Sequence, residues 1–204
     1  MKPFGKVTSV AAAILESDID TDVIFPARFL VTLEKKGLGK FAFFERRRNR
    51  ANKVPFVLDA PPFDKAQILV AGDKFGVGSS REHAVWALAD LGVRCIIAPS
   101  FGEIFYSNCF KNGVLPITVD MLEHEQISEQ AKAGKEICVD LLNREISLER
   151  PDAIKFAVPE DRRQALLQGR DEIGSILHDH EGAIAAFEKR HKTASPWLFV
   201  IVPI

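Results

Sequence analysis

Short apolar runs alternate with longer amphipathic stretches through the middle of the chain. The apolar runs lie at 67–71, 93–98 and 114–119, and each has the length of a buried strand. The stretches between them, about 80–91 and 101–112, have apolar residues at helical spacing, and each is followed by a glycine, which is typical of a helix C-terminus. Strands and helices that alternate with short connections predict right-handed crossovers and a parallel sheet.

The same patterns predict further elements on both sides of this unit. They are a strand at 6–15, a helix at 121–133, a hairpin of strands at 135–140 and 144–148, a strand at 153–158, a helix at 159–168 and a last helix within 173–191.

The first third of the chain is less regular. We expect short helices at 27–36 and 41–50, and a proline-containing loop at 52–62 around a short strand at 56–58. Irregular segments on a rigid scaffold often carry specificity. We therefore look to this part of the chain for contacts that select a ligand.

Composition and charge limit the class of protein. The chain has 204 residues, enough for one sizeable core and rather few for two. A net charge of −1 favours neither nucleic acid nor an acidic membrane, and the basic run at 46–50 is expected to be a solvated loop or helix end. The start has no apolar core of signal-peptide length, and the apolar stretch 197–204 is too short to span a bilayer, so we expect a cytoplasmic protein.

Cysteines and histidines give no metal motif. Cys95, Cys109 and Cys138 form no Cys-x-x-Cys pair and no cluster spacing. His178 and His180 are close in sequence, but a polar surface turn is the more common explanation for such a pair. The sequence therefore predicts no metal site on this chain.

One glycine-rich stretch, 76–83, combines several chemically active residues between a predicted strand and a predicted helix. Its sequence is Gly-Val-Gly-Ser-Ser-Arg-Glu-His. It lacks the third glycine of a dinucleotide fingerprint and the Gly-Lys-Ser/Thr end of a nucleotide-triphosphate loop. Arg81 also replaces the second glycine of a serine-nucleophile elbow. These differences argue against nucleotide binding and against a hydrolase.

Carboxylate recognition with proton transfer fits this stretch better. Arg81 offers a planar fork for a carboxylate, and Ser79 and Ser80 stand beside the free amides of a helix start. A serine is a poor base, and it can act as one only where dipoles and cations stabilise its oxyanion. A structural alternative stays open, because Ser79 and Glu82 have the spacing of a capping box.

A run of alternating acids, Asp18, Asp20 and Asp22, precedes the irregular region. It lacks the glycine and the distal glutamate of a calcium loop. A turn with Asx-type hydrogen bonds is the plainer interpretation. Alternatively, Asp20 and Asp22 orient a positively charged partner in a site.

Several stretches along the chain, in order, resemble one known family. Residues 78–84, Gly-Ser-Ser-Arg-Glu-His-Ala, resemble the signature of the mobile, or swivel, domain of the aconitase superfamily. The other stretches are similar to small subunits of bacterial 3-isopropylmalate dehydratase, and they are 20–26, 29–30, 96–101, 104–117, 171–174 and 183–188. The resemblance covers almost the whole chain.

The resemblance implies an α/β fold. This is a swivelling β/β/α domain of the aconitase type, with a mostly parallel central sheet, flanking helices and an added hairpin. We expect a single domain over residues 1–204, with a substrate-specificity region at about 27–50 and a helical C-terminal segment at 159–192.

The resemblance also implies a hydro-lyase of leucine biosynthesis. The family enzyme interconverts 2-isopropylmalate and 3-isopropylmalate, which are small dicarboxylic acids, by dehydration and rehydration. It is a heterodimer with a large subunit that holds a [4Fe–4S] cluster. We therefore expect no cofactor on this chain, the cluster on the partner, and no activity without that partner.

The site residues follow from the same resemblance. Ser79 takes the position of the base that removes the carbon-bound proton. The expected substrate-binding residues are Ser80 and Arg81 for carboxylate, Gly78 for close approach, Asp22, and Leu30 and Val31, which lie within the segment 29–33 that discriminates the substrate's side group.

Three departures from the family leave alternatives open. Val77 stands where many relatives carry cysteine, and 44–47 reads Phe-Glu-Arg-Arg where an aspartate–tryptophan pair is expected. The tail after Lys192 has no expected counterpart in the family. Paralogous small subunits act on citramalate, dimethylmalate or homoaconitate. A non-catalytic organic-acid-binding module is a further alternative, and the presence of both Ser79 and Arg81 argues against it.

Overall fold

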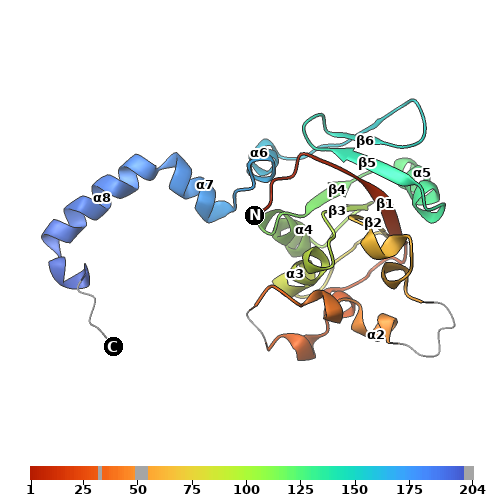
Figure 1. Cartoon of the computed structure of the whole chain (residues 1–204), viewed down its shortest axis with the longest axis horizontal. Helices are drawn as coiled ribbons and strands as arrows, with labels where there is room; N and C mark the ends of the chain where they lie inside the picture. The colour runs from red at the N-terminus through yellow and green to blue at the C-terminus, as the bar shows by residue number, and fades with distance from the viewer. Residues whose placement is uncertain (32–33, 49–54, 200–204) are drawn as a thin grey trace.

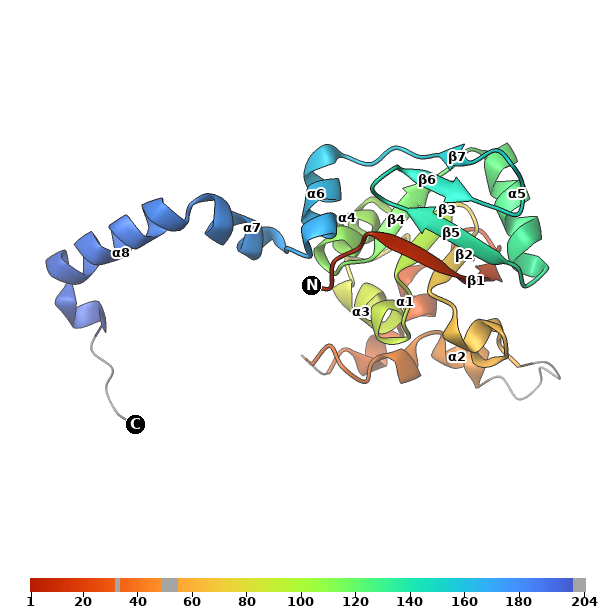
Figure 2. The same cartoon turned by 45° about the horizontal axis from the view of Figure 1, so that its top comes forward.

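Seven strands of the described residues form one sheet, in the order β4-β3-β2-β1-β5-β6-β7 (Figures 1 and 2). The computed structural model describes residues 1–31, 34–48 and 55–199. The strands are β1 (Lys6–Ile14), β2 (Ile68–Ala71), β3 (Cys95–Ala98), β4 (Leu115–Thr118), β5 (Glu136–Asp140), β6 (Glu145–Ser147) and β7 (Ile154–Lys155).

Strand β1 lies at the centre and joins a parallel part of the sheet to an antiparallel part. Its second half, from Ala11 to Ile14, pairs with β2, and β3 and β4 continue in parallel. Its first half, from Lys6 to Val10, pairs antiparallel with β5, which continues to β6 and β7. The predicted parallel unit and the predicted hairpin are both confirmed.

Helices connect and cover these strands. The α-helices are α1 (Thr21–Ile24), α2 (Phe44–Arg47), α3 (Glu82–Asp90), α4 (Glu103–Lys111), α5 (Met121–Lys132), α6 (Glu160–Gln168), α7 (Glu172–Asp179) and α8 (Glu181–Ala194). The 3₁₀ helices are η1 (Ala27–Phe29), η2 (Gly39–Phe41), η3 (Val57–Asp59), η4 (Phe63–Lys65) and η5 (Pro196–Phe199).

Four of the predicted elements differ from the structure. The helix predicted at 41–50 is, in the described residues, only the four-residue helix α2, and residues 49 and 50 lie outside those residues. The strand predicted at 56–58 is wrong, because Val57 begins the 3₁₀ helix η3. The helix predicted at 27–36 is, in the described residues, the single 3₁₀ turn η1, and Thr32 and Leu33 lie outside those residues. The last helix is divided at His180 into α7 and α8.

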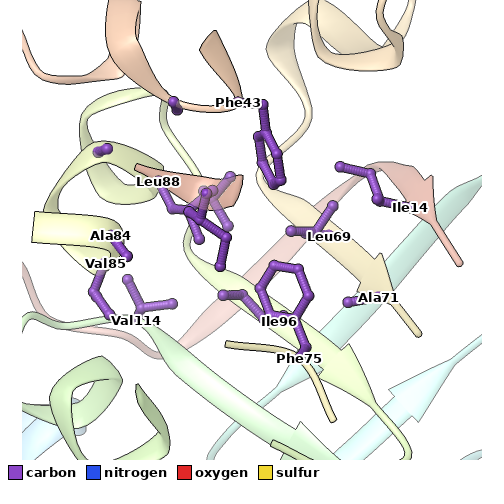
Figure 3. Close-up of a cluster of buried hydrophobic side chains, with 14 of the residues drawn as sticks. Ile14, Phe43, Leu69, Ala71, Phe75, Ala84, Val85, Leu88, Ile96 and Val114 are labelled. Carbon is purple, nitrogen blue, oxygen red and sulfur yellow. The ribbon is translucent and has the colours of Figure 1, made fainter. Parts of the chain in front are cut away.

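Alternate side chains of the strands fill a core on each face of the sheet. On one face, Leu69 and Ile96 pack with Val85 and Leu88 of α3 and with Phe43 (Figure 3). On the other face, the core contains Val70 and Ile97 together with residues of α5, α6 and the antiparallel strands. The four residues of β2 and of β3 are therefore all buried, as parallel strands covered on both faces require.

Helices α7 and α8 leave this body and extend from it as an arm (Figures 1 and 2). Large apolar side chains are exposed along the arm, namely Ile173, Ile176, Leu177, Phe187, Trp197, Leu198 and Phe199. None of the described helices is long and apolar enough to cross a membrane.

The division of the chain into a single domain with a specificity region and a C-terminal segment stays a prediction.

Candidate functional site

The glycine-rich stretch leaves the carboxyl end of β2 and lies beside the chain that follows β1. The amide of Gly76 donates to the carbonyl of Ile19 at 2.7 Å, and the amide of Thr21 donates to the carbonyl of Val77 at 2.9 Å. The hydroxyl of Thr21 donates to the carbonyl of Ser79, 58 residues away, at 3.1 Å. These bonds bring both candidate motifs to the edge of an α/β sheet where ligands commonly bind.

Two glycines let this loop pass close to α4. Gly76 has φ +76°, and a Cβ there would lie 2.2 Å from Cγ of Phe105. A Cβ on Gly102, just before α4, would lie 2.5 Å from the carbonyl oxygen of Gly76. A side chain at either position would force the loop and the start of α4 apart.

The predicted capping box of Ser79 and Glu82 is wrong. Helix α3 begins at Glu82, Arg81 is at the N-cap position, and no side chain caps the helix. The chain turns earlier, because the carbonyl of Ser79 accepts from the amide of Arg81 at 2.8 Å as well as from Thr21. Ser79 and Ser80 are both exposed, and the Ser79 hydroxyl has no hydrogen-bond partner among the described residues.

Glu82 bonds to two other side chains instead. Its Oε1 accepts from Nε1 of Trp86 at 3.2 Å and from Nδ2 of Asn112 at 2.8 Å. Asn112 is at the C-cap of α4. Glu82 therefore joins the start of α3 to the end of α4, a structural role that does not involve Ser79.

Arg81 is held by Asp22. An ion pair joins Nη1 of Arg81 to Oδ1 of Asp22, whose side chains are 19% and 54% exposed. The Asp22 carboxylate also accepts from the amide of Ala27 at 2.9 Å. The contact with the Arg81 guanidinium, followed by the hydrogen bond from the Ala27 amide, lowers the pKa of Asp22 below its ordinary value.

The Arg81–Asp22 contact leaves binding capacity at the guanidinium. Nη1 is buried and lies close to Asp22, but it has no aligned hydrogen-bond acceptor in the described part of the chain. A guanidinium carries five N–H donors, so one carboxylate contact does not occupy it. Arg81 is thus held by Asp22, and this ion pair engages only part of the donor capacity of its guanidinium.

Asp20 does not share the role of Asp22. Its Oδ1 accepts from the amide of Val23 at 2.7 Å and caps the short helix α1. Its backbone forms an isolated parallel bridge with Val77. Gly78, at φ +94°, lies against this same residue, where a Cβ would be 3.5 Å from Cβ of Asp20.

The predicted selectivity residues Leu30 and Val31 lie at the end of η1, and their side chains are 36% and 91% exposed. The preceding residue, Phe29, stacks on Phe41 at 4.3 Å between ring centroids and contacts Phe44 at 4.8 Å. Thr32 and Leu33, which complete the predicted segment 29–33, lie outside the described residues.

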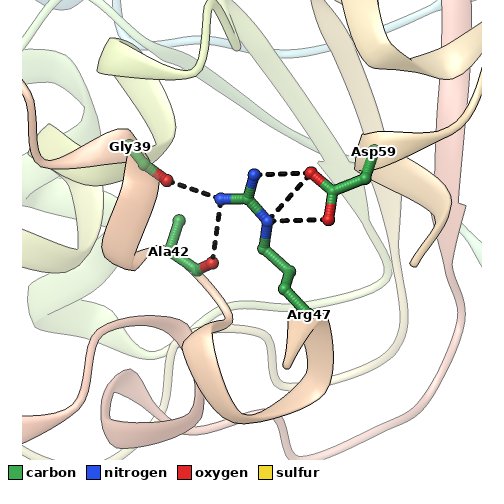
Figure 4. A network of polar contacts seen from close by, with 4 residues as sticks. All are labelled: Gly39, Ala42, Arg47 and Asp59. Atoms are coloured by element: carbon green, nitrogen blue, oxygen red, sulfur yellow. Dashed lines mark hydrogen bonds and ion pairs between the residues drawn. The ribbon is translucent and has the colours of Figure 1, made fainter. Parts of the chain in front are cut away.

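The basic run at 46–50 is structural where it is described. Arg47 donates from Nε to both carboxylate oxygens of Asp59 at 2.9 Å, and from Nη1 to the carbonyl of Gly39 at 2.8 Å (Figure 4). Arg46 pairs with Glu16 at 2.7 Å. The expected helix end is present as α2, but these two arginines are only 27% and 21% exposed, so the prediction of a solvated run is wrong for them.

The described residues contain no group of three or more His, Cys, Asp or Glu side chains that could hold a metal ion. Cys95 and Cys109 are buried, and burial raises the pKa of both thiols. Clefts of about 640 Å³ lie elsewhere, one between α6 and α7 and one beside α5. Ser79, Ser80 and Arg81 line neither of these two clefts.

Sequence reasoning missed the roles of Thr21 and Asn112. Both lie within stretches that resemble the family, but no local pattern assigns them a function. Thr21 fixes the carbonyl of Ser79, and Asn112 orients Glu82. Each acts on a residue far away in sequence, so only the fold identifies its partner.

Two family models match the chain. The model described as the aconitase C-terminal domain matches residues 1–122. The model described as the C-terminal domain of the small subunit of 3-isopropylmalate dehydratase matches residues 179–201, which include all of α8 and η5. The expectation that the tail after Lys192 has no counterpart in the family is therefore wrong as far as residue 201.

Individual proteins match over nearly the whole chain. The 3-isopropylmalate dehydratase small subunits of Agrobacterium fabrum and Mesorhizobium japonicum are each 46% identical over 201 residues, covering 97% of this chain and all of each relative. The small subunit of Parvibaculum lavamentivorans is 46% identical over 202 residues. A crystal structure of 3-isopropylmalate dehydratase from Methanocaldococcus jannaschii is 27% identical, covers 90% of this chain and 99% of that one, and has a TM-score of 0.65.

Proposed function

Because the chain belongs to the family of 3-isopropylmalate dehydratase small subunits, we propose that Ser79 is the base of the reaction and that Ser80 and Arg81 bind a substrate carboxylate. The chain is a subunit of a hydro-lyase of leucine biosynthesis, and a small subunit implies a large-subunit partner. The roles of the individual residues are our proposal.

The position of Ser79 supports its role as the base. Its carbonyl is fixed by Thr21 and Arg81, while its exposed hydroxyl stands before the first turn of α3. The free amides at the start of this nine-residue helix and the nearby guanidinium favour negative charge. They would stabilise the alkoxide form of Ser79, which takes up the carbon-bound proton and becomes the hydroxyl, and the missing cap leaves the Ser79 oxygen available for that transfer.

Arg81 would bind the substrate, and Asp22 would orient Arg81. An aspartate repels a dicarboxylic acid, so direct contact between Asp22 and a substrate carboxylate is unfavourable. Through its ion pair, Asp22 instead presents the guanidinium beside the serines. We thus propose that Asp22 acts on the substrate through Arg81, and that Gly78 leaves space for close approach.

The [4Fe–4S] cluster is assigned to the large subunit in this proposal. The described residues do not offer a ligand set for it, since two of the three cysteines are buried with raised pKa values. Proton transfer and carboxylate binding are the steps left to this chain, so its site is completed by the partner.

A cytoplasmic location stays a prediction.

Leu30 and Val31 would contact the side group of the substrate. Both are apolar and exposed, and an isopropyl group is an apolar ligand of matching size. The substrate we propose is therefore isopropylmalate, in both of its isomers.

The observation that carries the proposal concerns Ser79 and Arg81. Ser79 is exposed and its hydroxyl does not cap α3, and the guanidinium of Arg81, two residues later, is held by Asp22. The test combines the chain with its large subunit and follows the absorbance of the unsaturated acid. Ser79→Ala should lower kcat by about 10³-fold, the scale of a missing general base, while the complex still assembles. Ser147→Ala, at an exposed serine on β6, is the matched control.

Two results would contradict the proposal. Normal turnover by Ser79→Ala would remove Ser79 as the base. No turnover of any malate derivative by the unmodified complex would remove the proposed reaction.

A further inference from the structure

The exposed pair Leu30 and Val31 is attached to the body on its N-terminal side by aromatic rings. Phe29 stacks on Phe41, contacts Phe44, and lies 6.2 Å from Phe25 between ring centroids. The guanidinium of Arg28 lies 4.8 Å from the centre of the Phe29 ring. These contacts fix the chain up to Phe29.

The second attachment follows four residues after Val31, at Lys35. Nζ of Lys35 donates to Oδ1 of Asn112 at 2.9 Å and lies 4.8 Å from the centre of the Trp86 ring. Lys35 is exposed, whereas Asn112 and Trp86 are half-buried. Its ammonium group therefore lies on a surface formed by Trp86 of α3 and by Asn112 at the end of α4.

That surface continues to the candidate site. Nε1 of Trp86 donates to Oδ1 of Asn112 at 2.9 Å, and Nδ2 of Asn112 donates to Glu82 at 2.8 Å. Glu82 is the residue after Arg81. Lys35 is thus linked through the side chains of Asn112 and Trp86 to Glu82. Glu82 begins α3, directly after the proposed carboxylate-binding residues.

We propose that Lys35 is a positioning residue that sets the distance between the side-group contacts at Leu30 and Val31 and the carboxylate contacts at Ser80 and Arg81. The inference rests on the proposed function, because it uses the roles given there to these four residues. It adds a residue that touches neither part of the substrate. Lys35 acts by fixing its own position in the chain, four residues after Val31, to the network of Asn112, Trp86 and Glu82.

A lysine suits such a role. Its ammonium can meet the amide oxygen and the indole ring together, and a long side chain can span the gap without burying the backbone. Its neighbour Lys36 is also exposed, and within the described residues it makes neither of these two interactions. Lys36 therefore provides a control with the same change of charge.

The first experiment measures selectivity in the complex with the large subunit. The ratio of kcat/KM for 2-isopropylmalate to that for citramalate, which carries a methyl group on the same carbon instead, reports how well the side group is placed. Lys35→Met should lower this ratio by about ten-fold through KM, with kcat for citramalate within about twofold. Lys35→Arg, which keeps the cation, should restore most of the ratio, and Lys36→Met should leave it unchanged.

The second experiment measures the contact itself, without any turnover. The chain has two tryptophans, so Trp197→Phe leaves Trp86 as the only one. In that background Lys35→Met should change the intensity and position of Trp86 emission, and Lys36→Met should change neither.

The outcomes separate the inference from the proposed function. If the complexes are active and Lys35→Met has the same ratio of kcat/KM values as Lys36→Met, the role of Lys35 is overturned. The proposed reaction is unaffected by that result. Unchanged Trp86 emission in Lys35→Met overturns the contact even where turnover fails. An unmodified complex that turns over neither acid contradicts the reaction itself.

Discussion

The glycine-rich stretch at 76–83 and the described residues of the segment 27–48 both belong to the candidate site, but they are held in place by different kinds of interaction. Backbone hydrogen bonds to Ile19 and Thr21 and the close approach of Gly76 to Phe105 fix the loop. The segment is fixed mainly by side chains, among them the stacked rings around Phe29 and the bonds of Arg47 and Lys35.

This difference matches the two tasks that we propose for these regions, proton transfer by the first and contact with the side group of the substrate by the second. A proton-transfer geometry has to be the same for every substrate, and backbone contacts are insensitive to most substitutions. Side-chain contacts can be replaced one at a time, so the segment that meets the variable part of a substrate can change without disturbing the base. Three substitutions and one measurement of pH dependence test this division, starting with the largest expected effect.

Gly76→Ala should strongly destabilise the fold. A Cβ at φ +76° would meet the Phe105 ring at 2.2 Å, and strain and overlap together should lower the free energy of unfolding by about 3 kcal/mol. Urea unfolding measures the change. Gly182→Ala, in α8 with no atom within 4 Å of the added carbon, is the control. Equal stability of the two variants would mean that the loop is not fixed by its close approach to α4.

Asp22→Asn should affect activity more than stability. Without the ion pair, the Arg81 guanidinium is less well oriented, and kcat/KM should fall about 10- to 100-fold, which corresponds to roughly 1.4–2.7 kcal/mol. The free energy of unfolding should fall by less than about 1 kcal/mol, because Asp22 is exposed. Asp18→Asn removes a looser pair, 3.6 Å from Lys74, and should leave kcat/KM unchanged. The same loss in both variants would argue against orientation by Asp22.

Phe29→Leu should loosen only the side-chain-held segment. Losing the stacked and tilted ring contacts should lower the free energy of unfolding by about 1 kcal/mol and raise KM, with kcat little changed. Phe187→Leu, which alters an exposed ring in the arm, is the control. If kcat falls by the same factor as KM rises, the segment around Phe29 also affects the proposed base, Ser79.

The smallest expected effect is on stability at low pH, through the carboxyl group of Asp22. The pKa of Asp22 is lower in the folded chain than in the unfolded one, because Arg81 and then the amide of Ala27 bond to its charged form. Its stabilising contribution is therefore complete above pH about 4 and is lost as the pH falls through the folded pKa. Urea midpoints measured from neutral pH down to about pH 3 should fall slightly less steeply for Asp22→Asn than for the unmodified chain. Equal slopes would mean that the ion pair does not persist in solution.

The regular half of the fold follows from local patterns, and the site follows from them only in part. The buried strands β2, β3 and β4 and the helices between them are continuous apolar or amphipathic runs, so their prediction succeeds. The position of β1 between the two parts of the sheet depends on pairing with residues 68–71 and 136–140, which no local pattern contains.

The start of α3 shows why local signals fail near the site. Ser79 and Glu82 have the spacing of a capping box, but the hydroxyl of Thr21 holds the Ser79 carbonyl and Asn112 holds the Glu82 carboxylate. Both partners are remote in sequence and override the local preference. Where no such partner intervenes, as at Asp120 and Glu123 at the start of α5, the capping box forms.

Asn112 has a further consequence, for the chemical ageing of the protein. It precedes Gly113, and an asparagine before glycine is the sequence in which the following amide nitrogen most readily attacks the side chain and releases ammonia. Here the Gly113 amide donates to the carbonyl of Phe110 at 3.3 Å, and Nδ2 of Asn112 donates to Glu82 and to the carbonyl of Asn108. The folded chain thus holds both reacting groups apart. A chain that deamidates while unfolded would refold with a second carboxylate facing Glu82, at the start of α3.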